Sequence, residues 1–358
     1  METKVIAIDH KAMDEAVLQE AGTIIKNGGL VAFPTETVYG LGGDALNKES
    51  SRKIYAAKGR PSDNPLIVHI AGMEMIHPLV SELPESALKL ADEFWPGPLT
   101  MILPKSDAVP YGTTGGLDTV AIRMPSHPVA WKLIHDSQIP LAAPSANTSG
   151  RPSPTRAEHV YDDLNGKIDM ILDDGPVGIG IESTIVDLTG EVPMVLRPGY
   201  ITREMLAEVL GEVIIDPAIL DENKDKNFKP KAPGMKYKHY APKGDLHLVE
   251  GAFENVVRKI CELTDEKVGE GYKVGIIATE ETKTIYEQQM AGNHAVVIMS
   301  IGTRKDEDTI THNLYDILRR MDGADVAFIY SESFGEGTRG QAIMNRLLKA
   351  AGYQQIHV

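Results

Sequence analysis

The sequence predicts an α/β protein with two domains, and three observations lead to this prediction. At 358 residues the chain is longer than a typical single domain. Short apolar stretches of strand length alternate with amphipathic helical stretches along the whole chain. Residues 216–231 are charged and poor in large apolar side chains, which is typical of a linker. We therefore expect a larger domain over 1–215, a linker over 216–244 and a smaller domain over 245–358.

The composition excludes several classes of protein. The single cysteine, Cys261, excludes an internal disulfide and a cysteine-based zinc cluster, and it suits a reducing compartment. The formal net charge of −15 argues against tight binding of this chain alone to a nucleic acid backbone. No apolar stretch approaches the roughly 20 residues of a membrane span, and the N-terminus lacks the layout of a signal peptide. We therefore expect a cytoplasmic protein that acts without a membrane.

In the larger domain, apolar periodicity and terminating residues identify the elements. Residues 11–26 carry apolar side chains at helical spacing, and Thr202 is placed to cap a helix that starts at Arg203. Strands are expected over residues 4–8, 30–33, 66–70, 99–103, 119–123, 141–143, 169–172, 183–188 and 192–197. The other helices are expected over residues 50–57, 84–94, 128–136 and 203–210. No regular element is expected in 35–43 or in 109–117, because both are rich in Gly and Thr.

The smaller domain alternates regularly between strands and helices. Strands are expected over residues 246–249, 273–278, 295–300 and 326–330, and helices over residues 253–263, 281–290, 306–321 and 340–350. This alternation predicts a doubly wound, Rossmann-like sheet. The last loop, residues 335–340, matches G-x-G-x-x-G, but it follows the final strand rather than the first. A tight turn from strand to helix is the favoured interpretation, and nucleotide binding is the alternative.

The stretch 30–70 carries the densest set of polar side chains that could serve chemistry. A strand is followed by a Thr-rich and Gly-rich loop, and the next helix delivers Lys58 and Arg60 close to Asn64. The strand after it carries His69. Hydroxyls, backbone amides, two cations and an imidazole at neighbouring strand ends predict an anion site. The plainer alternatives are a solvated helix end for the two cations and a core histidine for the imidazole.

Three further parts of the chain could contribute to the same site. Arg123 and Arg197 each stand at a strand end, where a structural role and a ligand role both fit. The loop 144–153 combines small hydroxyl and amide side chains with prolines, which suits ligand contacts. The run 232–242 holds two tyrosines, a histidine and two lysines between prolines. We expect this run to fold back over the site, with a passive linker as the alternative.

The common catalytic motifs are absent from the sequence. It contains no Walker A lysine motif, no protein kinase set, no HExxH and no G-x-S-x-G elbow. What remains is positive charge, hydroxyls and strand-end amides. These groups stabilise a phosphoryl group in transfer and do not supply a nucleophile.

Seven segments in one order carry a resemblance to a known family. They read GGLVAFPTETVYGLG, KGRPSDNPLIVHI, WPGPLT, VAIRMPSHP, APSANTSGRPSPT, ESTIVD and VLRPG. Together they resemble the YrdC-like domain of threonylcarbamoyl-AMP synthases, over about residues 13–211. The run PGMKYKHYAP and the appended α/β domain resemble the longer, two-domain form of that family. The resemblance implies a YrdC-like, twisted mixed sheet with helices for the larger domain.

The resemblance also implies a reaction. L-Threonine, bicarbonate (or CO2) and ATP would give L-threonylcarbamoyl-AMP and pyrophosphate, which makes the chain a nucleotidyltransferase. The product would serve the N6-threonylcarbamoylation (t6A formation) of adenosine 37 in tRNAs that read ANN codons. A downstream t6A transferase complex would perform that step. Mg2+ is expected to arrive with ATP, because no carboxylate cluster marks a dedicated metal site.

The resemblance assigns roles residue by residue. The residues expected to bind threonine or bicarbonate are Thr37, His69, Arg123, Ala143 and Ser183. Those expected to bind ATP are Lys58, Arg60, Asn64, Thr119, Ser145, Ser153 and Arg197, with Tyr237 and His239 closing over the nucleotide from the linker. Lys58 and Arg60 are the expected catalytic residues, because they would bear the charge of the reacting phosphate and of the leaving pyrophosphate. Arg123 suits the carboxylate of the amino acid through a bidentate contact.

Two other functions remain open from the sequence. The first is an RNA-binding translation or ribosome-assembly factor that uses the same basic surface, although the acidic net charge weighs against it. The second is a carbamoyltransferase of the hydrogenase-maturation type, which shares this kind of domain. That enzyme would need cysteine-rich zinc modules, and a single cysteine excludes them.

Overall fold

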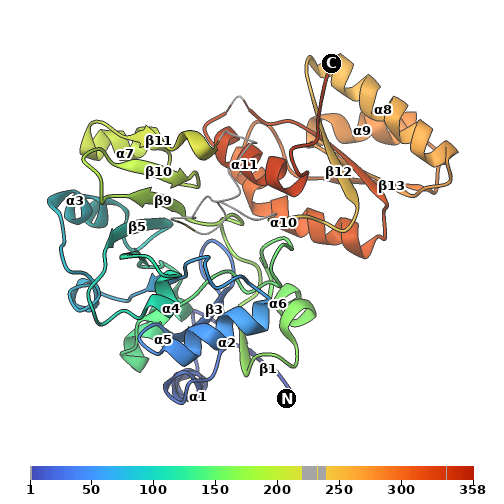
Figure 1. Cartoon of the computed structure of the whole chain (residues 1–358). Helices are drawn as coiled ribbons and strands as arrows, with labels where there is room; N and C mark the ends of the chain where they lie inside the picture. The colour runs from blue at the N-terminus through green and yellow to red at the C-terminus, as the bar shows by residue number, and fades with distance from the viewer. Residues whose placement is uncertain (1, 220–231, 233–238, 336) are drawn as a thin grey trace. The chain divides into compact units, whose positions relative to one another are not determined.

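The chain forms two compact units (Figure 1). The computed structural model describes residues 2–219, 232, 239–335 and 337–358. The first unit comprises Met1–Ser149 and Ser153–Tyr237, and the second comprises Gly150–Pro152 and Lys238–Val358. Most of the expected linker lies outside the described residues, so its closure over the site stays a prediction.

The first unit is built on one mixed sheet. Among the described residues its strands lie in the order β1-β8-β2-β3-β7-β4-β6-β5-β9-β10-β11. Their bounds are β1 Lys4–Ala7, β2 Val31–Phe33, β3 Gly40–Asp44, β4 Ile67–His69, β5 Leu99–Pro104, β6 Thr119–Arg123, β7 Leu141–Ala142, β8 Met170–Asp173, β9 Thr184–Asp187, β10 Met194–Arg197 and β11 Ile214–Ile215. Strand β6 runs parallel to β4 on one side and antiparallel to β5 on the other. This mixed sheet with helices confirms the fold class predicted for the larger domain.

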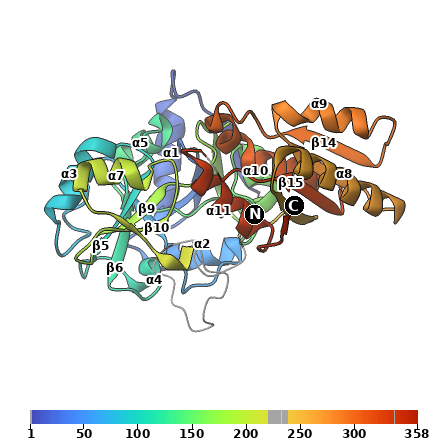
Figure 2. The same cartoon turned by 90° about the horizontal axis from the view of Figure 1, so that it is seen from above.

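Helices accompany this sheet along the chain. Their bounds are α1 Glu15–Lys26, α2 Lys48–Lys58, α3 Glu85–Phe94, α4 Tyr111–Thr114, α5 Pro128–Ser137, α6 Ala157–Leu164 and α7 Arg203–Leu210. In α1 the side chain of Asp14 accepts the N–H of Ala16 in the first turn, and Leu18 and Ile25 are buried on one face. Helices α3 and α7 lie side by side (Figure 2). Among the helices of the described residues, none is both long and apolar enough to cross a membrane.

Apolar side chains are buried on both faces of the sheet. In β2, Ala32 belongs to one cluster of buried side chains, whereas Val31 and Phe33 belong to another. Successive side chains of a strand point to opposite faces, so the two clusters lie on opposite sides of the sheet. A sheet covered on both faces leaves the strand ends as the place where polar groups can gather.

Strand β6 places several polar residues together at one end of the sheet. Its register with β4 puts Arg123 next to His69, and its register with β5 puts Arg123 opposite Thr100. Strand β5 also pairs with β9, which Ser183 directly precedes. The fold therefore brings together residues that lie far apart in the sequence.

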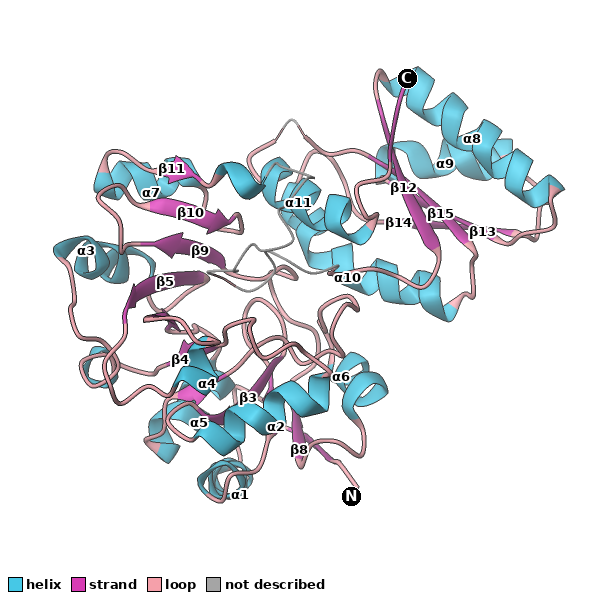
Figure 3. Ribbon diagram, in the orientation of Figure 1, coloured by secondary structure: helices cyan, strands magenta, loops and turns pink. Residues whose placement is uncertain are grey.

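The second unit is a parallel sheet in the order β14-β13-β15-β12-β16. Its strands are β12 Asp245–Glu250, β13 Val274–Ala278, β14 Val296–Ser300, β15 Phe328–Glu332 and β16 Gln355–His357. Its helices are α8 Phe253–Gly269, α9 Glu280–Gln289, α10 Glu307–Gly323 and α11 Gly340–Ala350. Helices α8 and α9 lie on one face of the sheet, and α10 and α11 lie on the other (Figure 3). The prediction of a doubly wound, Rossmann-like unit is confirmed.

The prediction of a loop over residues 35–43 is wrong in its second half. Residues 40–44 form strand β3, in which Gly42 pairs with Val31. A Cβ atom at Gly42 would lie 2.6 Å from the ring of Phe33. Glycine is required here by close packing between neighbouring strands and does not mark a turn.

The prediction that 109–117 is irregular is also wrong, because the short helix α4 forms inside it. Pro110 precedes its first turn, and Gly115 ends it with a φ of 63°.

Five elements of the described residues were not predicted at all: helix α6, the short strands β11 and β16, and the 3-10 helices η1 Met73–Met75 and η2 Pro217–Ile219. Apart from α6, each has three residues or fewer, too few for apolar periodicity to identify it. Helix α6 is as long as α7 and carries Ala157, Val160 and Leu164 at helical spacing, so its signal was present and was missed.

Ile122 tests the contribution of strand β6 to stability. Its side chain is fully buried, so we expect Ile122→Ala to lower the free energy of unfolding of the first unit by about 2–5 kcal/mol. Urea unfolding followed by tryptophan fluorescence measures this, since Trp95 and Trp131 both lie in the first unit. Leu88→Ala, at an exposed position, is the control and should change the value by less than about 0.5 kcal/mol. Equal losses in both variants would contradict the burial of this strand.

Candidate active site

Arg123 lies at the centre of the polar cluster and is only 4 % exposed. Its Nη1 donates to Thr37 Oγ1 at 2.8 Å, and its Nε donates to the carbonyl of Gly97 at 3.2 Å. Its Nη2 lies 2.6 Å from Oε1 of Glu36. A buried cation is tolerated only when it is paired and hydrogen-bonded, and these contacts fulfil that need. They also fix the plane of the guanidinium beside Thr37.

The loop after β2 is held by a threonine hydroxyl. Thr35 Oγ1 accepts the N–H groups of Thr37 and Val38, both at 3.2 Å, and donates to the carbonyl of Val38 at 2.6 Å. In a tight turn, such a hydroxyl forms the hydrogen bonds that the backbone N–H and C=O groups cannot form with other backbone groups. Residues 179–180 donate their N–H groups to the carbonyls of Glu36 and Thr37, at 2.8 and 3.1 Å. The backbone of this turn is therefore fixed, and it directs the side chains of Glu36 and Thr37 to the guanidinium of Arg123.

His69 lies beside Arg123 as a neutral imidazole. Burial, and to a lesser extent Arg123, lowers the pKa of His69 to about 3. Its Nδ1 lies 3.2 Å from the carbonyl of Ile67, so this nitrogen carries the proton and donates it. The other nitrogen, Nε2, is then left as a hydrogen-bond acceptor.

Arg197 is a second buried arginine near the same strand ends. Its Nε donates to the carbonyl of Ser183 at 3.0 Å, and its Nη2 donates to Ser183 Oγ at 3.1 Å. Ser183 Oγ also lies 2.8 Å from Oγ1 of Thr100, which stands opposite Arg123 in the sheet. Polar groups thus continue in a row from Arg123 to Arg197.

Lys58 holds the loop that follows β7. It is the last residue of α2, and its side chain is 1 % exposed. Its ammonium group donates to the carbonyl of Ser145, to the carbonyl of Asn147 at 2.5 Å and to Asn147 Oδ1 at 3.3 Å. Ser145 Oγ donates to the same Oδ1 at 2.6 Å. The lysine therefore organises this polar loop, a role that the sequence did not suggest.

Backbone hydrogen bonds join the Lys58 loop to the strands of the Arg123 cluster. The N–H of Ala143 donates to the carbonyl of Ile67 in β4 at 2.8 Å, close to His69. The N–H of Ala146 donates to the carbonyl of Tyr39, next to β3, also at 2.8 Å. Ala143, predicted to contact the substrate, therefore lies beside the strand that carries the imidazole.

Arg60 and Asn64 lie close together after α2. Arg60 is half-buried; its Nε donates to the carbonyl of Asn64 at 3.3 Å, and its Nη2 donates to the carbonyl of Pro65 at 2.9 Å. Asn64 is buried, and among the described residues its Oδ1 has no hydrogen-bond partner. The pair therefore combines a fixed cation with an unused acceptor.

The remaining residues that were predicted to bind ATP are Thr119, Ser153, His239 and Tyr237. Thr119 begins β6 and is half-buried, and Ser153 donates to Oε1 of Glu182 at 2.5 Å. His239 is buried within the second unit. Tyr237 lies outside the described residues. The roles of these residues toward a nucleotide stay predictions.

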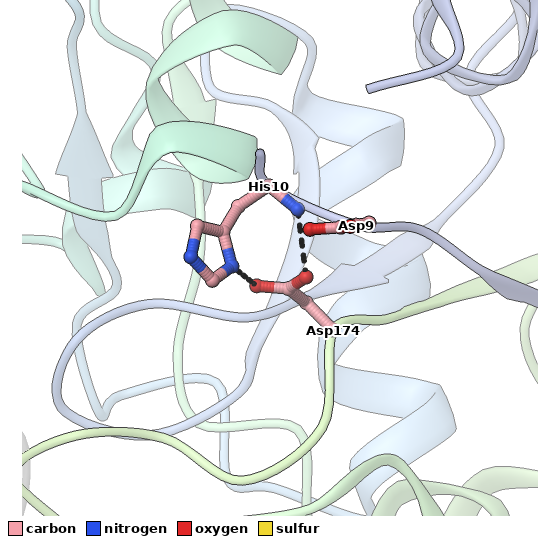
Figure 4. Close-up of side chains that lie close together, drawn as sticks. All are labelled: Asp9, His10 and Asp174. Atoms are coloured by element: carbon pink, nitrogen blue, oxygen red, sulfur yellow. Dashed lines mark hydrogen bonds and ion pairs between the residues drawn. The ribbon is translucent and has the colours of Figure 1, made fainter. Parts of the chain in front are cut away.

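Asp174, just after β8, is hydrogen-bonded to His10 (Figure 4). The N–H of His10 donates to its Oδ1 at 2.9 Å, and His10 Nδ1 and His127 Nε2 lie 2.7 and 3.2 Å from its Oδ2. His127 Nδ1 accepts the N–H of Val129, so Nε2 carries the ring proton and donates to Asp174. Asp9 lies beside this group. We interpret the cluster as a hydrogen-bonded junction between the ends of β1 and β8.

The G-x-G-x-x-G loop connects β15 to α11, as the favoured interpretation predicted. At the start of this helix, Glu307 Oε2 accepts the N–H of Arg339 at 2.8 Å. A Cβ atom at Gly337 would overlap the carboxylate of Glu307. The chain's own carboxylate therefore occupies the place where such a loop would hold a phosphate.

Sequence reasoning missed three residues of the site. Glu36, Thr100 and Asn147 all lie inside segments that carried the family resemblance, yet none was assigned a role. The available signal was a polar side chain within a run of small or apolar residues. Their partners lie far away in the sequence, so local pattern alone could not assign them.

Comparison with known proteins identifies relatives that match this chain over nearly its whole length. A family model described as Telomere recombination matches residues 23–199, and one described as Threonylcarbamoyl-AMP synthase, C-terminal domain, matches residues 201–352. A threonylcarbamoyl-AMP synthase from Pyrococcus abyssi is 48 % identical, covering 97 % of each chain. One from Bacillus subtilis is 48 % identical, covering 96 % of this chain and 95 % of the relative. The crystal structure of P. abyssi Sua5 complexed with L-threonine matches with a TM-score of 0.91 at 47 % identity, over 99 % of this chain and 100 % of that chain.

The fold and the site define a class first: a two-unit α/β protein with a buried, arginine-rich polar site at the strand ends of its larger unit. The relatives then define the family, because nearly the whole length of both chains is matched at 48 % identity. The chain belongs to the threonylcarbamoyl-AMP synthase family. The resemblance read from the sequence is thereby confirmed, whereas the roles of individual residues stay predictions.

The lowered pKa of His69 predicts how stability depends on pH. The unfolded chain takes up a proton at this residue near its ordinary pKa of 6.5, but the folded chain does so only at about 3. Stability is therefore lost as the pH falls below 6.5, by about 2 kcal/mol between pH 8 and pH 5 from this group alone. We expect His69→Gln to remove about this much of the pH dependence, as measured by urea unfolding at each pH.

The matched control for this measurement is His77→Gln, because that histidine is exposed. The control should follow the wild-type curve at every pH. Parallel curves for wild type and His69→Gln would show that the pKa of His69 is the same in the folded and the unfolded chain and would contradict its lowered pKa.

Proposed function

We propose that this chain joins L-threonine, bicarbonate and ATP to give L-threonylcarbamoyl-AMP and pyrophosphate, and so acts as a nucleotidyltransferase. The observation that carries the proposal is the buried Arg123, held by Thr37 and next to His69 in the sheet. A planar guanidinium is the group best suited to a carboxylate. Membership of the family supports the same product here, and the P. abyssi relative was crystallised with L-threonine.

The amino acid would bind among the strand ends of the first unit. In this proposal Arg123 binds the α-carboxylate, and the hydroxyls of Thr37 and Ser183 supply hydrogen bonds. The neutral His69 offers Nε2 as an acceptor, which suits the hydroxyl of threonine or of bicarbonate. Ala143 lies beside the same strand and contributes its backbone.

The nucleotide would bind on the side of the Lys58 loop. Lys58 holds that loop and lends its charge to the phosphate bound there, and the half-buried Arg60 faces the leaving pyrophosphate. The other residues proposed to bind ATP are Asn64, Thr119, Ser145, Ser153, Arg197, Tyr237 and His239. Closure by the linker residues belongs to this proposal as well.

The chemistry needs cations more than it needs a nucleophile on the protein. Threonine and bicarbonate form a carbamate, whose oxygen attacks the α-phosphate in line and displaces pyrophosphate. Three anionic groups must meet, so positively charged side chains lower the barrier by holding them together. No covalent intermediate with the protein is required.

Magnesium is proposed to enter with ATP. This ion prefers oxygen ligands and commonly binds through substrate phosphates and a few carboxylates. Within the part of the chain that the structure describes, the group of three side chains that could hold a metal is Asp9, His10 and Asp174, of which His10 and Asp174 are hydrogen-bonded to each other (Figure 4). The Lys58 loop offers no comparable group among those residues, so no step is assigned to the ion.

The product would pass to a downstream transferase complex that modifies adenosine 37 of tRNAs that read ANN codons. We place this reaction in the cytoplasm, in line with the single cysteine of the chain. The net charge of −15 gives no support to strong direct binding of RNA by this chain.

Release of pyrophosphate tests the proposed reaction. We expect the full-length chain to release pyrophosphate from ATP when both threonine and bicarbonate are present. Omitting either one should lower the rate at least about tenfold, because the attacking carbamate cannot form. A coupled pyrophosphate assay in buffer freed of CO2 measures this. ATP turnover that ignores both substrates would contradict the proposal, and salt-dependent RNA binding without turnover would favour an RNA-binding factor.

Arg123→Lys tests the assignment of the amino acid side of the site. Lysine keeps the charge but loses the planar pair of donors, so the KM for threonine should rise about 10- to 100-fold. The KM for ATP should change less than about threefold, because the nucleotide lies elsewhere. Steady-state kinetics measures both values, and Arg52→Lys on the exposed face of α2 is the matched control. Equal rises in the two KM values would remove Arg123 from the threonine site.

A further inference from the structure

Glu36 is a largely buried carboxylate that is paired with Arg123 but keeps hydrogen-bonding capacity for a ligand. Its side chain is 13 % exposed, and its Oε1 lies 2.6 Å from Nη2 of Arg123. Among the described residues, neither carboxylate oxygen forms a well-aligned hydrogen bond, and the same holds for Nη2 of Arg123. Buried polar atoms without such partners are unfavourable and usually mark the place of a ligand or water. The Glu36–Arg123 ion pair therefore leaves acceptor capacity on the carboxylate for a ligand in the site.

The charged surroundings of this carboxylate are simple. Arg123, on β6, contacts it directly, and the neighbouring His69 is neutral. His127, at the start of α5, lies within electrostatic reach of Glu36. Burial lowers the pKa of His127 more than Asp174 and Glu36 raise it, so this imidazole is neutral near pH 7. Its ring proton is directed to Asp174, and Arg123 is the cation that balances Glu36 among the described residues.

We propose that Glu36 binds the α-ammonium group of threonine and takes one of its protons. The inference rests on the proposed function, in which Arg123 binds the α-carboxylate. An amino acid carries both of these charges on one carbon atom, and the Glu36–Arg123 pair offers the complementary charges side by side. A carboxylic acid without the ammonium group would place a second anion near Glu36 with no cation of its own. The pair therefore selects an amino acid over the matching hydroxy acid.

The proton transfer is needed because an ammonium nitrogen has no lone pair for attack. One N–H proton moves to Glu36, which becomes a carboxylic acid. The freed lone pair forms the N–C bond to bicarbonate, and a second amine proton leaves with the bicarbonate hydroxyl as water. The product of this step is the threonine carbamate. Glu36 returns its proton to solvent after the products leave, which makes it a general base.

Glu36→Gln keeps the shape of the side chain but cannot take the proton. Near neutral pH we expect its kcat/KM for threonine to fall about 100-fold, with the KM for ATP within about twofold of wild type. As the pH rises, the rate of the variant relative to wild type should recover about tenfold per pH unit, because more threonine arrives as the free amine. If the Glu36–Arg123 pair had only a structural role, the relative rate of Glu36→Gln would not recover as the pH rises.

Two further measurements support the test. Glu36→Asp retains a carboxylate and should keep more activity than Glu36→Gln, although aspartate is the poorer match in shape. Calorimetric titration with L-threonine and with 3-hydroxybutanoate, which lacks the ammonium group, measures the selectivity of binding. Wild type should bind threonine at least about tenfold more tightly, and Glu36→Gln should lose most of this preference. Glu49→Gln, at an exposed site on α2, is the control and should match wild type in every assay.

The outcomes separate this inference from the reaction on which it rests. Absence of pyrophosphate release by wild type with all substrates overturns the proposed function itself. An active wild type together with a Glu36→Gln variant that equals it at every pH overturns the role of Glu36 alone. If that variant does not fold, as seen by tryptophan fluorescence, the titration of wild type decides. Equal binding of threonine and 3-hydroxybutanoate by wild type would then overturn the inference.

Discussion

A buried guanidinium group is the constraint on which the larger unit depends. Arg123 stands at the end of β6 with almost no contact with solvent, and a cation in that position must be compensated. The compensation comes from Glu36 and Thr37 after β2 and from the carbonyl of Gly97 before β5. Satisfying this one charge therefore draws two distant loops to the same strand end. The candidate site for an amino acid follows from that requirement.

Lys58 repeats the same physical principle on the side of the first unit that we propose for the nucleotide. Its ammonium group is buried, and the oxygens of Ser145 and Asn147 surround it. The charge fixes the shape of the loop and at the same time makes the loop attractive to phosphate. In a chain with a net charge of −15, Arg123 and Lys58 are thus both held in fixed positions by oxygens of neighbouring loops.

The sequence was sufficient to predict the bounds of an element where the residues that determine them lie within a few positions of one another. Strand β6, Thr119–Arg123, and helix α7, Arg203–Leu210, agree with their predictions at both ends, because apolar periodicity and the cap by Thr202 act within a few residues. Strand β3 was predicted as a loop because it is rich in glycine. Glycine is needed there to leave room for the ring of Phe33 in the neighbouring strand, which the sequence does not reveal.

The class of site could be predicted from cations and hydroxyls near strand ends. The role of Glu36 could not, because its partner becomes visible only when β6 is placed in the sheet. Likewise, no local pattern indicates that Gly150–Pro152 belongs to the second unit.

The crystal structure of this chain with L-threonine bound would test most directly whether Arg123 and Glu36 together recognise the amino acid. We predict the α-carboxylate at hydrogen-bond distance from the guanidinium, about 2.7–3.2 Å, and the ammonium nitrogen at a similar distance from a carboxylate oxygen of Glu36. A threonine whose carboxylate points away from Arg123, or whose ammonium group contacts only backbone carbonyls, would contradict this recognition.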